Sequence, residues 1–457
     1  MVRCMRWCNT ALLLGTVVLT GCATYSDSFG VIERDLSIQR YDDALAEIEK
    51  QSQSNKDKVL YLLNKGMILR MKRDYGASNQ TFEAAKTEME RLYAASVSEN
   101  ALSFVVNDST VSYAGDDYEQ VLVHLYMALN YLQLGQSDDA RVEALQVDLK
   151  LREIAEKIPE SSYTEDALSR YLAGMIYEER REWSDAMISY RKAYEAYKKY
   201  QKNYGLPMPD MLKHDLLRLA KRVGLTDELR QYQQEFGIDP SANDDPAADT
   251  DGELVFVLNN GLAPIKKEKI INATAPVAVS VGTSDSGKPA PPPVVVTIAV
   301  PYYVSRPDMV VSARVTVSGK QVKTENMENI DAIARASLDA RMPAIMARSI
   351  ARAVAKAEIQ KSVDRAGSNR DNDAAAALLG SFIVRVAAIA TERADTRSWL
   401  TLPANVQIAK LALPPGDYTV KVDLMNTGGS VVSTLEYPDV AITPQHYTYL
   451  SQHWISN

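Results

Sequence analysis

The sequence predicts a multidomain chain, α then α+β: a helical repeat half followed by a β-sandwich-like domain with an inserted helical hairpin. Apolar residues recur at helical spacing up to about residue 238, and runs of β-branched residues replace them beyond residue 253. The 457 residues are enough for two or three cores. We expect a signal segment at 1–21, a helical domain at 22–238, an acidic linker at 239–252 and a β-rich domain at 253–457 with its helical insertion at 331–391.

The helical half contains an internal repeat. Tyr41 and Tyr75 open two similar segments that lie 34 positions apart, and further copies begin at Asp138 and Trp183 after longer gaps. The pattern resembles the tetratricopeptide repeat (TPR), which implies an α-solenoid of antiparallel helix pairs. An insertion near 93–120 interrupts the array, and a further helix pair at 209–236 is expected to close it.

The TPR resemblance also implies a binding groove, because the first helix of each pair lines the inner face in that family. The lining is more apolar than that of clamps that hold peptide carboxylates. Two occupants therefore remain open: an apolar helix or strand of an envelope protein partner, or the chain's own insertion. The candidate groove residues are Leu60, Leu63, Met67, Leu122, Leu125, Leu129, Leu132, Leu168, Tyr171 and Met175.

A second candidate surface is a tyrosine-rich helix near the end of the array. Its five tyrosines recur at helical spacing and alternate with lysines. They either pack against the closing helix pair or form an exposed face for glycan strands or a partner, because tyrosine offers contact area at low entropic cost. The candidates are Tyr190, Tyr194, Tyr197, Tyr200 and Tyr204.

The first residues have the anatomy of a secretory signal. Arg3 and Arg6 form a short basic segment, and an apolar run at 11–20 follows that is too short for a stable transmembrane helix. Of the three cysteines in the chain, Cys4 and Cys8 would leave with this signal. Only one cysteine would then remain, which excludes disulfides within the mature chain and cysteine metal sites.

The end of the signal resembles a lipobox. Leu19, Thr20 and Gly21 precede Cys22 as in substrates of lipoprotein signal peptidase, which implies cleavage before Cys22 and acyl chains on that cysteine. Several acyl chains would anchor the protein stably in a membrane. By the same resemblance, Ala23 implies sorting to the periplasmic face of the outer membrane.

The β-rich half contains seven expected strands and a helical insertion. The four residues at 426–429, Asn-Thr-Gly-Gly, predict a hairpin turn between two of the strands. In the insertion, Pro343 is expected to open a second helix. The strands are expected at 253–258, 294–300, 310–317, 406–413, 418–424, 431–435 and 447–450.

A basic stripe follows the first inserted helix. It comprises Arg341, Arg348, Arg352 and Lys356, opposite the apolar face. Such a stripe is typical of a solvated outer face, and it also occurs on helices that lie on anionic membranes. Both interpretations remain open, with the solvated face favoured.

Motifs for chemistry are weak in this chain. Residues 282–288 match part of a phosphate-binding loop, but Pro289 stands where a Ser or Thr is required. The acidic linker lacks the alternating ligands of a calcium loop, and the four histidines match no zinc-protease pattern. We therefore expect no catalytic residues, no metal and no cofactor. The net charge of -8 argues against a nucleic acid partner.

Three C-terminal phrases, at 260–266, 394–403 and 413–418, resemble a poorly characterised family of TPR-containing Gram-negative envelope lipoproteins. Its members are neighbours of lipoproteins related to activators of penicillin-binding proteins. The resemblance implies an envelope location and no known activity. Within the second phrase, Asp395, Arg397 and Trp399 form either a structural corner, which is favoured, or a binding site.

These observations favour a non-catalytic protein–protein interaction scaffold in envelope assembly or in cell-wall or export machinery. Its partners would be envelope proteins at the TPR-like groove and the membrane at Cys22. A peptidoglycan- or glycan-binding lipoprotein is the alternative. An enzyme with an unrecognised site is the third, and it would need a deep pocket that gathers titratable groups from distant parts of the sequence.

Overall fold

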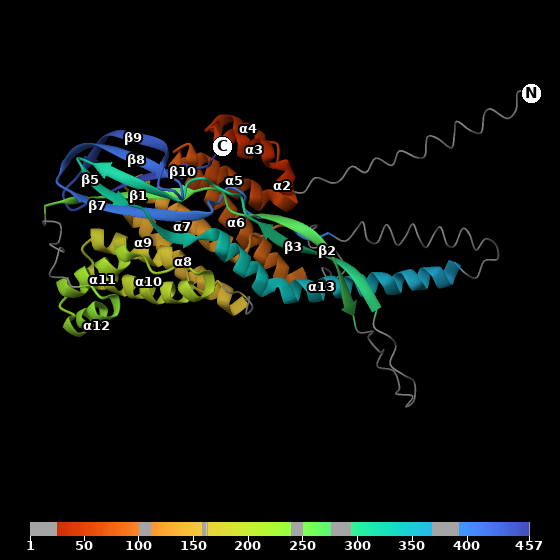
Figure 1. Cartoon of the computed structure of the whole chain (residues 1–457). Helices are drawn as coiled ribbons and strands as arrows, with labels where there is room; N and C mark the ends of the chain where they lie inside the picture. Colours follow the sequence, from red (N-terminus) through yellow and green to blue (C-terminus); the bar gives the residue numbers. More distant parts are fainter. Residues whose placement is uncertain are drawn as a thin grey trace, which may run out of the picture.

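The computed structural model describes residues 25–99, 111–157, 161, 163–238, 250–275, 294–367 and 393–456. Helices fill the first half and three sheets with one long helix fill the second (Figure 1). The helices of the first half are α2 (Tyr25–Ser28), α3 (Gly30–Ser37), α4 (Tyr41–Glu49), the short 3-10 helix η1 (Asn55–Asp57), α5 (Lys58–Met71), α6 (Tyr75–Glu99), α7 (Asp117–Gln133), α8 (Ser137–Lys157), α9 (Ala167–Glu179), α10 (Trp183–Tyr204), α11 (Asp210–Arg222) and α12 (Thr226–Phe236).

The predicted helix repeat is present, and the same turn recurs in every pair. The pairs are α3/α4, α5/α6, α7/α8, α9/α10 and α11/α12. In each connection one residue has a positive φ, and the next residue donates its backbone N–H to a carbonyl of the last turn of the first helix. This is the Schellman arrangement, which ends a helix and reverses the chain. The positive-φ residues are Gln39, Arg73, Gly135, Arg181 and Gly224.

Small residues allow the paired helices to approach closely, as the repeat pattern predicts. A Cβ atom added to Gly66 of α5 would lie 2.5 Å from the ring of Phe82 in α6. A Cβ atom added to Gly174 of α9 would lie 2.3 Å from the ring of Tyr190 in α10. Both distances are too short for an alanine, so each glycine accommodates the large ring of the partner helix.

Two four-stranded sheets share an apolar core in the second half. One has the order β10-β1-β7-β6, with β1 and β10 parallel, and the other has the order β5-β4-β8-β9. Their common core includes Phe256, Val315 and Val422. The strands are β1 (Gly252–Asn260), β4 (Ser312–Val317), β5 (Lys320–Lys323), β6 (Glu325–Asn329), β7 (Asn405–Leu413), β8 (Gly416–Met425), β9 (Val431–Ile442) and β10 (Tyr447–Trp454).

The predicted turn at 426–429 joins β8 and β9, and the Asn426 side chain accepts the backbone N–H groups of Gly428 and Ser430. All seven predicted strands occur. Three further strands were not predicted: β5 and β6, which are short, and β2 (Ile265–Ala275), whose lysines and glutamate hide its pattern. Strand β2 pairs with β3 (Val294–Val304) in a separate two-stranded sheet.

The prediction that Pro343 opens a second helix is wrong. One helix, α13 (Ile330–Gly367), runs through Pro343 without a break. Pro343 is exposed, so the carbonyl that loses its N–H partner can be hydrated and the helix tolerates the proline. The second helix of the expected hairpin, at 374–390, lies outside the described residues.

The β2–β3 sheet and α13 extend away from the rest of the molecule, and we call them the arm (Figure 1). Val296, Ile298 and Val300 of β3 pack against α13, where Met346 and Ile350 meet them. The base of α13 contacts α7, α10 and β7. The arm is therefore a packed unit that is joined to both halves.

Candidate functional site

The inner face of the repeats is covered by the chain itself. All ten candidate groove residues are buried, and they belong to one apolar cluster with Val255 of β1, Met327 of β6 and Ile408 of β7. Figure 1 shows the β10-β1-β7-β6 sheet lying along the array. The chain alone buries the inner face of the repeats, so this burial does not require a partner. Among the described residues the cover is mainly the C-terminal half, because an apolar sheet face and an apolar groove each need such a cover. Residues 100–110 of the insertion at 93–120 lie outside the described residues.

Residues 393–404 fill the part of the groove next to α5, α6 and α7. The Trp399 indole is buried edge-on against Phe82 and Tyr126, with ring centroids 5.7 Å and 6.0 Å away. The Trp399 backbone N–H donates to Oε1 of Glu119 at 2.7 Å. The Thr401 backbone N–H donates to Oδ1 of Asn64 at 3.1 Å. The segment is thus held by both apolar and polar contacts.

The favoured interpretation of the sequence 395–399 agrees with these contacts. The guanidinium of Arg397 pairs with Asp395 at 2.7 Å and with Asp57, the last residue of η1, at 3.1 Å. It also donates to the carbonyl of Val111 at 2.9 Å. The acid, the base and the indole therefore form a structural corner that ties the C-terminal half to the repeats.

The five candidate tyrosines of α10 do not form an exposed aromatic face. All five are buried. Tyr194 donates to Glu235 of α12, the expected packing on the closing pair. Tyr197 instead donates to the carbonyl of Met327 at 2.9 Å, and Tyr200 donates to Oε1 of Glu328 at 3.0 Å. The exposed interpretation is therefore wrong, because the strand β6 covers this side of the helix.

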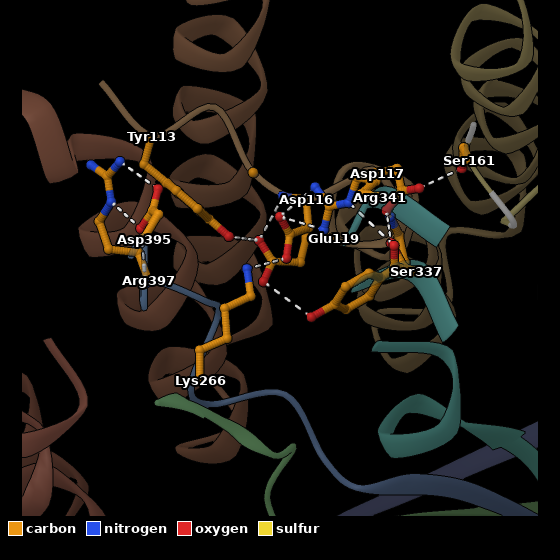
Figure 2. A network of polar contacts seen from close by, with 12 residues as sticks. Tyr113, Asp116, Asp117, Glu119, Ser161, Lys266, Ser337, Arg341, Asp395 and Arg397 are labelled. Atoms are coloured by element: carbon orange, nitrogen blue, oxygen red, sulfur yellow. Dashed lines mark hydrogen bonds and ion pairs between the residues drawn. The ribbon is translucent and has the colours of Figure 1, made fainter. Parts of the chain in front are cut away.

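A buried polar network joins α7 to the arm (Figure 2). Asp116 precedes α7 and accepts hydrogen bonds from Nζ of Lys266 on β2 at 2.6 Å and from Arg341 on α13 at 3.0 Å. Asp117 accepts hydroxyl hydrogen bonds from Ser161 and from Ser337 of α13. The start of one repeat helix thus fixes the base of the arm.

Charge compensation sets the ionisation of Asp116. Burial alone would raise its pKa, but the cations of Arg341 and Lys266 outweigh burial and lower the pKa to about 2. The carboxylate is therefore ionised under all ordinary conditions. In turn, burial would lower the pKa of Arg341, and the Asp116 carboxylate raises it well above its usual value. One carboxylate here holds two cations.

Glu119, in the first turn of α7, has a raised pKa, in contrast to Asp116. Burial and the neighbouring Asp116 carboxylate raise its pKa from 4.5 to about 7. Its carboxyl closes a capping box with the backbone N–H of Asp116 at 3.1 Å and accepts the Tyr113 hydroxyl at 2.6 Å. The sequence pattern Asp-x-x-Glu at 116–119 is a helix-start signal from which this capping box could have been predicted.

A second buried ionic cluster joins α11 to β7. Asp215 accepts hydrogen bonds from Lys410 at 2.9 Å, from Arg218 at 2.8 Å and from the Tyr171 hydroxyl at 2.6 Å. Burial would raise the pKa of Asp215, but Lys410 and Arg218 lower it to about 2. Tyr171 was a candidate for contacting a partner, and it instead supports this contact between the two halves.

A cavity of about 390 Å³ opens beside this cluster. Its lining includes Glu178, Glu179, Glu253 and His446, which are distant in sequence. Each of these three carboxylates already has a basic side chain as its partner: Arg218 for Glu178, His446 for Glu179 and Lys410 for Glu253. A pocket of this kind is what an enzyme would require, so the expectation of a non-catalytic protein stays a prediction.

The basic stripe of α13 lies partly in the protein interior. Arg341, Arg348 and Arg352 line one cavity of about 140 Å³, together with Lys266 and Arg393. The favoured solvated face is therefore wrong for Arg341 and Arg352, because β2 and residues 393–395 cover that side of the helix. The side chain of Lys356 lies outside the described residues.

The lipobox residues Leu19, Thr20, Gly21 and Cys22, with Ala23, also lie outside the described residues. Within residues 25–456, as far as the structure describes them, no helix is long and apolar enough to cross a membrane. The same residues contain no cluster of three or more His, Cys, Asp or Glu side chains that could hold a metal ion.

No known protein-family model matches this chain, and no curated protein sequence matches it. Among solved structures, the chain is similar to the MamA RS-1 ArsTM double mutant, with 13% identity and a TM-score of 0.28 over 46% of this chain and 89% of that one. It is also similar to BtubC from P. vanneervenii, with 15% identity and a TM-score of 0.31 over 47% of this chain and 78% of that one. A Podosopora anserina kinesin light chain of nearly identical TPR-like repeats matches with 13% identity and a TM-score of 0.28, over 48% and 96%. These scores are low, and the repeat assignment rests on the turns and glycine contacts of the chain itself.

Proposed function

We propose that this chain is a lipid-anchored envelope protein that acts as a non-catalytic protein–protein interaction scaffold, and that it presents the arm to its partner. The observation that carries the proposal is the projection of the arm beyond the rest of the molecule (Figure 1). On the arm, Ile270 of β2 and Val295 of β3 are 64% and 67% exposed. Exposed apolar side chains on a projecting element are typical of protein contact surfaces.

The repeat groove is a poor candidate for the contact surface. Its apolar lining is already buried against β1, β6, β7 and residues 393–404. A partner would have to displace the Trp399 indole and the sheet before it could enter. The array therefore supports the position of the arm, in contrast to repeats that bind a ligand along their inner face.

The arm has features that suit a partner with an extended segment. A two-stranded sheet is marginally stable by itself, and α13 stabilises this one from one side. Strands β2 and β3 pair only with each other among the described strands. A partner strand can add to such an edge through backbone hydrogen bonds, while side chains such as Ile270 provide apolar contact.

The membrane anchor is the second part of the proposal. Cys22 lies in the lipobox-like sequence just before α2, which begins at Tyr25. A lipid on Cys22 would hold the first helices close to the membrane surface. The outer membrane is the proposed location because Ala23, rather than an aspartate, follows the cysteine. The partner would then be a component of envelope assembly or of the cell-wall or export machinery.

The experiment is photo-crosslinking in cells with p-benzoylphenylalanine introduced into the full chain at Ile270. A matched control carries the crosslinker at Ile188, which is 47% exposed on α10 and lies outside the arm. We expect one discrete crosslinked protein from Ile270 and none from Ile188. A crosslink from Ile188 alone would move the contact surface to the repeats, and no crosslinked protein from either position would refute the scaffold proposal.

A further inference from the structure

The first helices are held firmly to the repeat array. Tyr25 opens α2, and its hydroxyl accepts a hydrogen bond from the side chain of Asn64 in α5 at 3.0 Å. The same hydroxyl donates to the side chain of Gln51, which follows α4, at 3.2 Å. On the inner side of α3, Ile32 and Leu36 are buried in the core of the repeats. The position of α2 and α3 is therefore fixed relative to the other repeat helices.

The distance from Cys22 to α2 is limited by covalent geometry. Tyr25 stands only three positions after Cys22, and three residues reach at most about 10 Å when fully extended. The headgroup layer on each side of a bilayer is roughly 5–8 Å thick. A lipid on Cys22 would therefore bring α2 and the neighbouring α3 against the headgroups, because the chain between them is too short to hold them away.

The outer face of α3 carries apolar side chains. Val31 and Ile38, at the C-terminal end of the helix, are 43% and 47% exposed. They are seven positions apart, about two helical turns, so they lie on the same side of the helix. Arg34 lies between them and is exposed, and its guanidinium has no ion pair among the described residues. Aliphatic side chains next to a basic one suit a helix that lies on a lipid surface.

The acidic side chains around this face are compensated. Asp35 interacts with Arg40, and Arg34 adds one further positive charge. The acidic and basic side chains named here are thus equal in number, and the face has no excess negative charge that lipid phosphates would repel. The three ion pairs beside the face are Glu33 with Arg306, Asp42 with Lys72 and Asp43 with Arg40.

We propose that the outer face of α3 lies on the membrane that the lipid on Cys22 enters. This inference rests on the proposed lipid anchor, and it adds a second contact with the bilayer that the protein itself makes. Val31 and Ile38 enter the headgroup layer. The guanidinium of Arg34 donates hydrogen bonds to lipid phosphates, while its aliphatic stem lies along the apolar side chains.

The second contact has a consequence for the whole molecule. A lipid anchor alone is a single point about which a protein can tilt, and a contact at α3 limits this tilt. Figure 1 shows α3 at one end of the repeat array and α12 at the other. Because the network around Asp116 fixes the arm to α7, the contact also sets where the arm lies relative to the membrane.

The test uses the full lipidated chain in vesicles of phosphatidylethanolamine and phosphatidylglycerol, with the fluorescent dye NBD attached to one introduced thiol. The variant is Val31→Cys. The matched control is Val142→Cys, since Val142 is 53% exposed on α8, outside the first helices. The lipid blocks Cys22, and Cys4 and Cys8 leave with the signal, so the dye reacts at the introduced position.

We expect lipids that carry a nitroxide at the headgroup to quench NBD at position 31 and to leave NBD at position 142 unquenched. Ile38→Cys, on the same face, should behave as Val31→Cys does. A chain that floats with the vesicles but shows no quenching at position 31 would overturn the contact and leave the lipid anchor in place. A chain that does not float would overturn the anchor and the contact together. Equal quenching at positions 31 and 142 would also overturn the contact, because it would not be specific to α3.

Discussion

Replacement of Trp399 by alanine tests whether the C-terminal half holds the repeats together. Trp399 is 1% exposed and lies edge-on against Phe82 of α6 and Tyr126 of α7. Truncation of a buried tryptophan costs about 3–5 kcal/mol in the free energy of unfolding. Each lost edge-to-face contact adds about 0.5–1.5 kcal/mol to the loss of buried area. We therefore expect Trp399→Ala to lower the free energy of unfolding by about 5 kcal/mol, the upper end of the range for a buried tryptophan.

The assay is urea unfolding followed by far-ultraviolet circular dichroism, which reports mainly on the helices. Since the repeats and residues 393–404 share one core, the helical signal should shift to lower urea although the substitution lies outside every helix. Trp183→Ala is the control, because Trp183 is only half-buried and its ring lies under the Arg222 guanidinium of α11. A loss below about 1 kcal/mol for Trp399→Ala, the value typical of average substitutions, would refute the idea that this segment fills the groove.

Four further predictions follow from single residues. The pKa of Glu119 is raised from 4.5 to about 7, so its stabilising contribution is complete below pH 4.5 and is lost as the pH rises through 7. The Glu119→Gln variant should lack about 3 kcal/mol of this pH-dependent loss in the free energy of unfolding, measured by urea unfolding across this range. Burial lowers the pKa of His453 from 6.5 to about 4, so its contribution to stability is complete above pH 6.5 and is lost as the pH falls through 4. In the same urea assay, His453→Gln should reduce the loss of unfolding free energy between pH 6.5 and pH 4, and an unchanged pH dependence would contradict the lowered pKa. Gly174→Ala would place a Cβ atom 2.3 Å from the Tyr190 ring and should cost about 1–3 kcal/mol, seen as a lower thermal midpoint; an unchanged midpoint would mean that α9 and α10 are not so close. Cys22→Ala should abolish incorporation of labelled palmitate and release the chain from membranes, and a labelled variant would refute lipidation at that residue.

The repeats show which contacts can be predicted from local sequence. Gly66 and Phe82, or Gly174 and Tyr190, could be paired from their spacing because each pair lies within one helix hairpin. Short-range contacts of this kind follow from helical periodicity. The strand β2 was missed because burial there follows the network around Asp116, and its lysines look solvated in the sequence.

The α13 helix shows the opposite case. Its sequence placed Arg341, Arg348 and Arg352 on one face and favoured solvent for them. The structure brings β2 and residues 393–395 against that face, from positions far away along the chain. Proline at position 343 predicted a break, but the helix runs through it, because Pro343 is exposed and the freed carbonyl can be hydrated. Contacts from distant segments therefore decided that this face is partly buried, although the helical pattern itself was predicted correctly.

By itself, the sequence determined the helix repeat, the strand-rich second half and the lipobox-like start, because each depends on the period or identity of neighbouring residues. Only the tertiary structure decided that the repeat groove is filled by the chain, that the α10 tyrosines are buried, and that an arm projects with basic residues at its base. The physical reason is that an apolar face specifies burial without specifying its partner. The partner of each apolar face depends on how whole layers of secondary structure fit together. Contacts between residues as distant in sequence as Asn64 and Thr401 complete that fit.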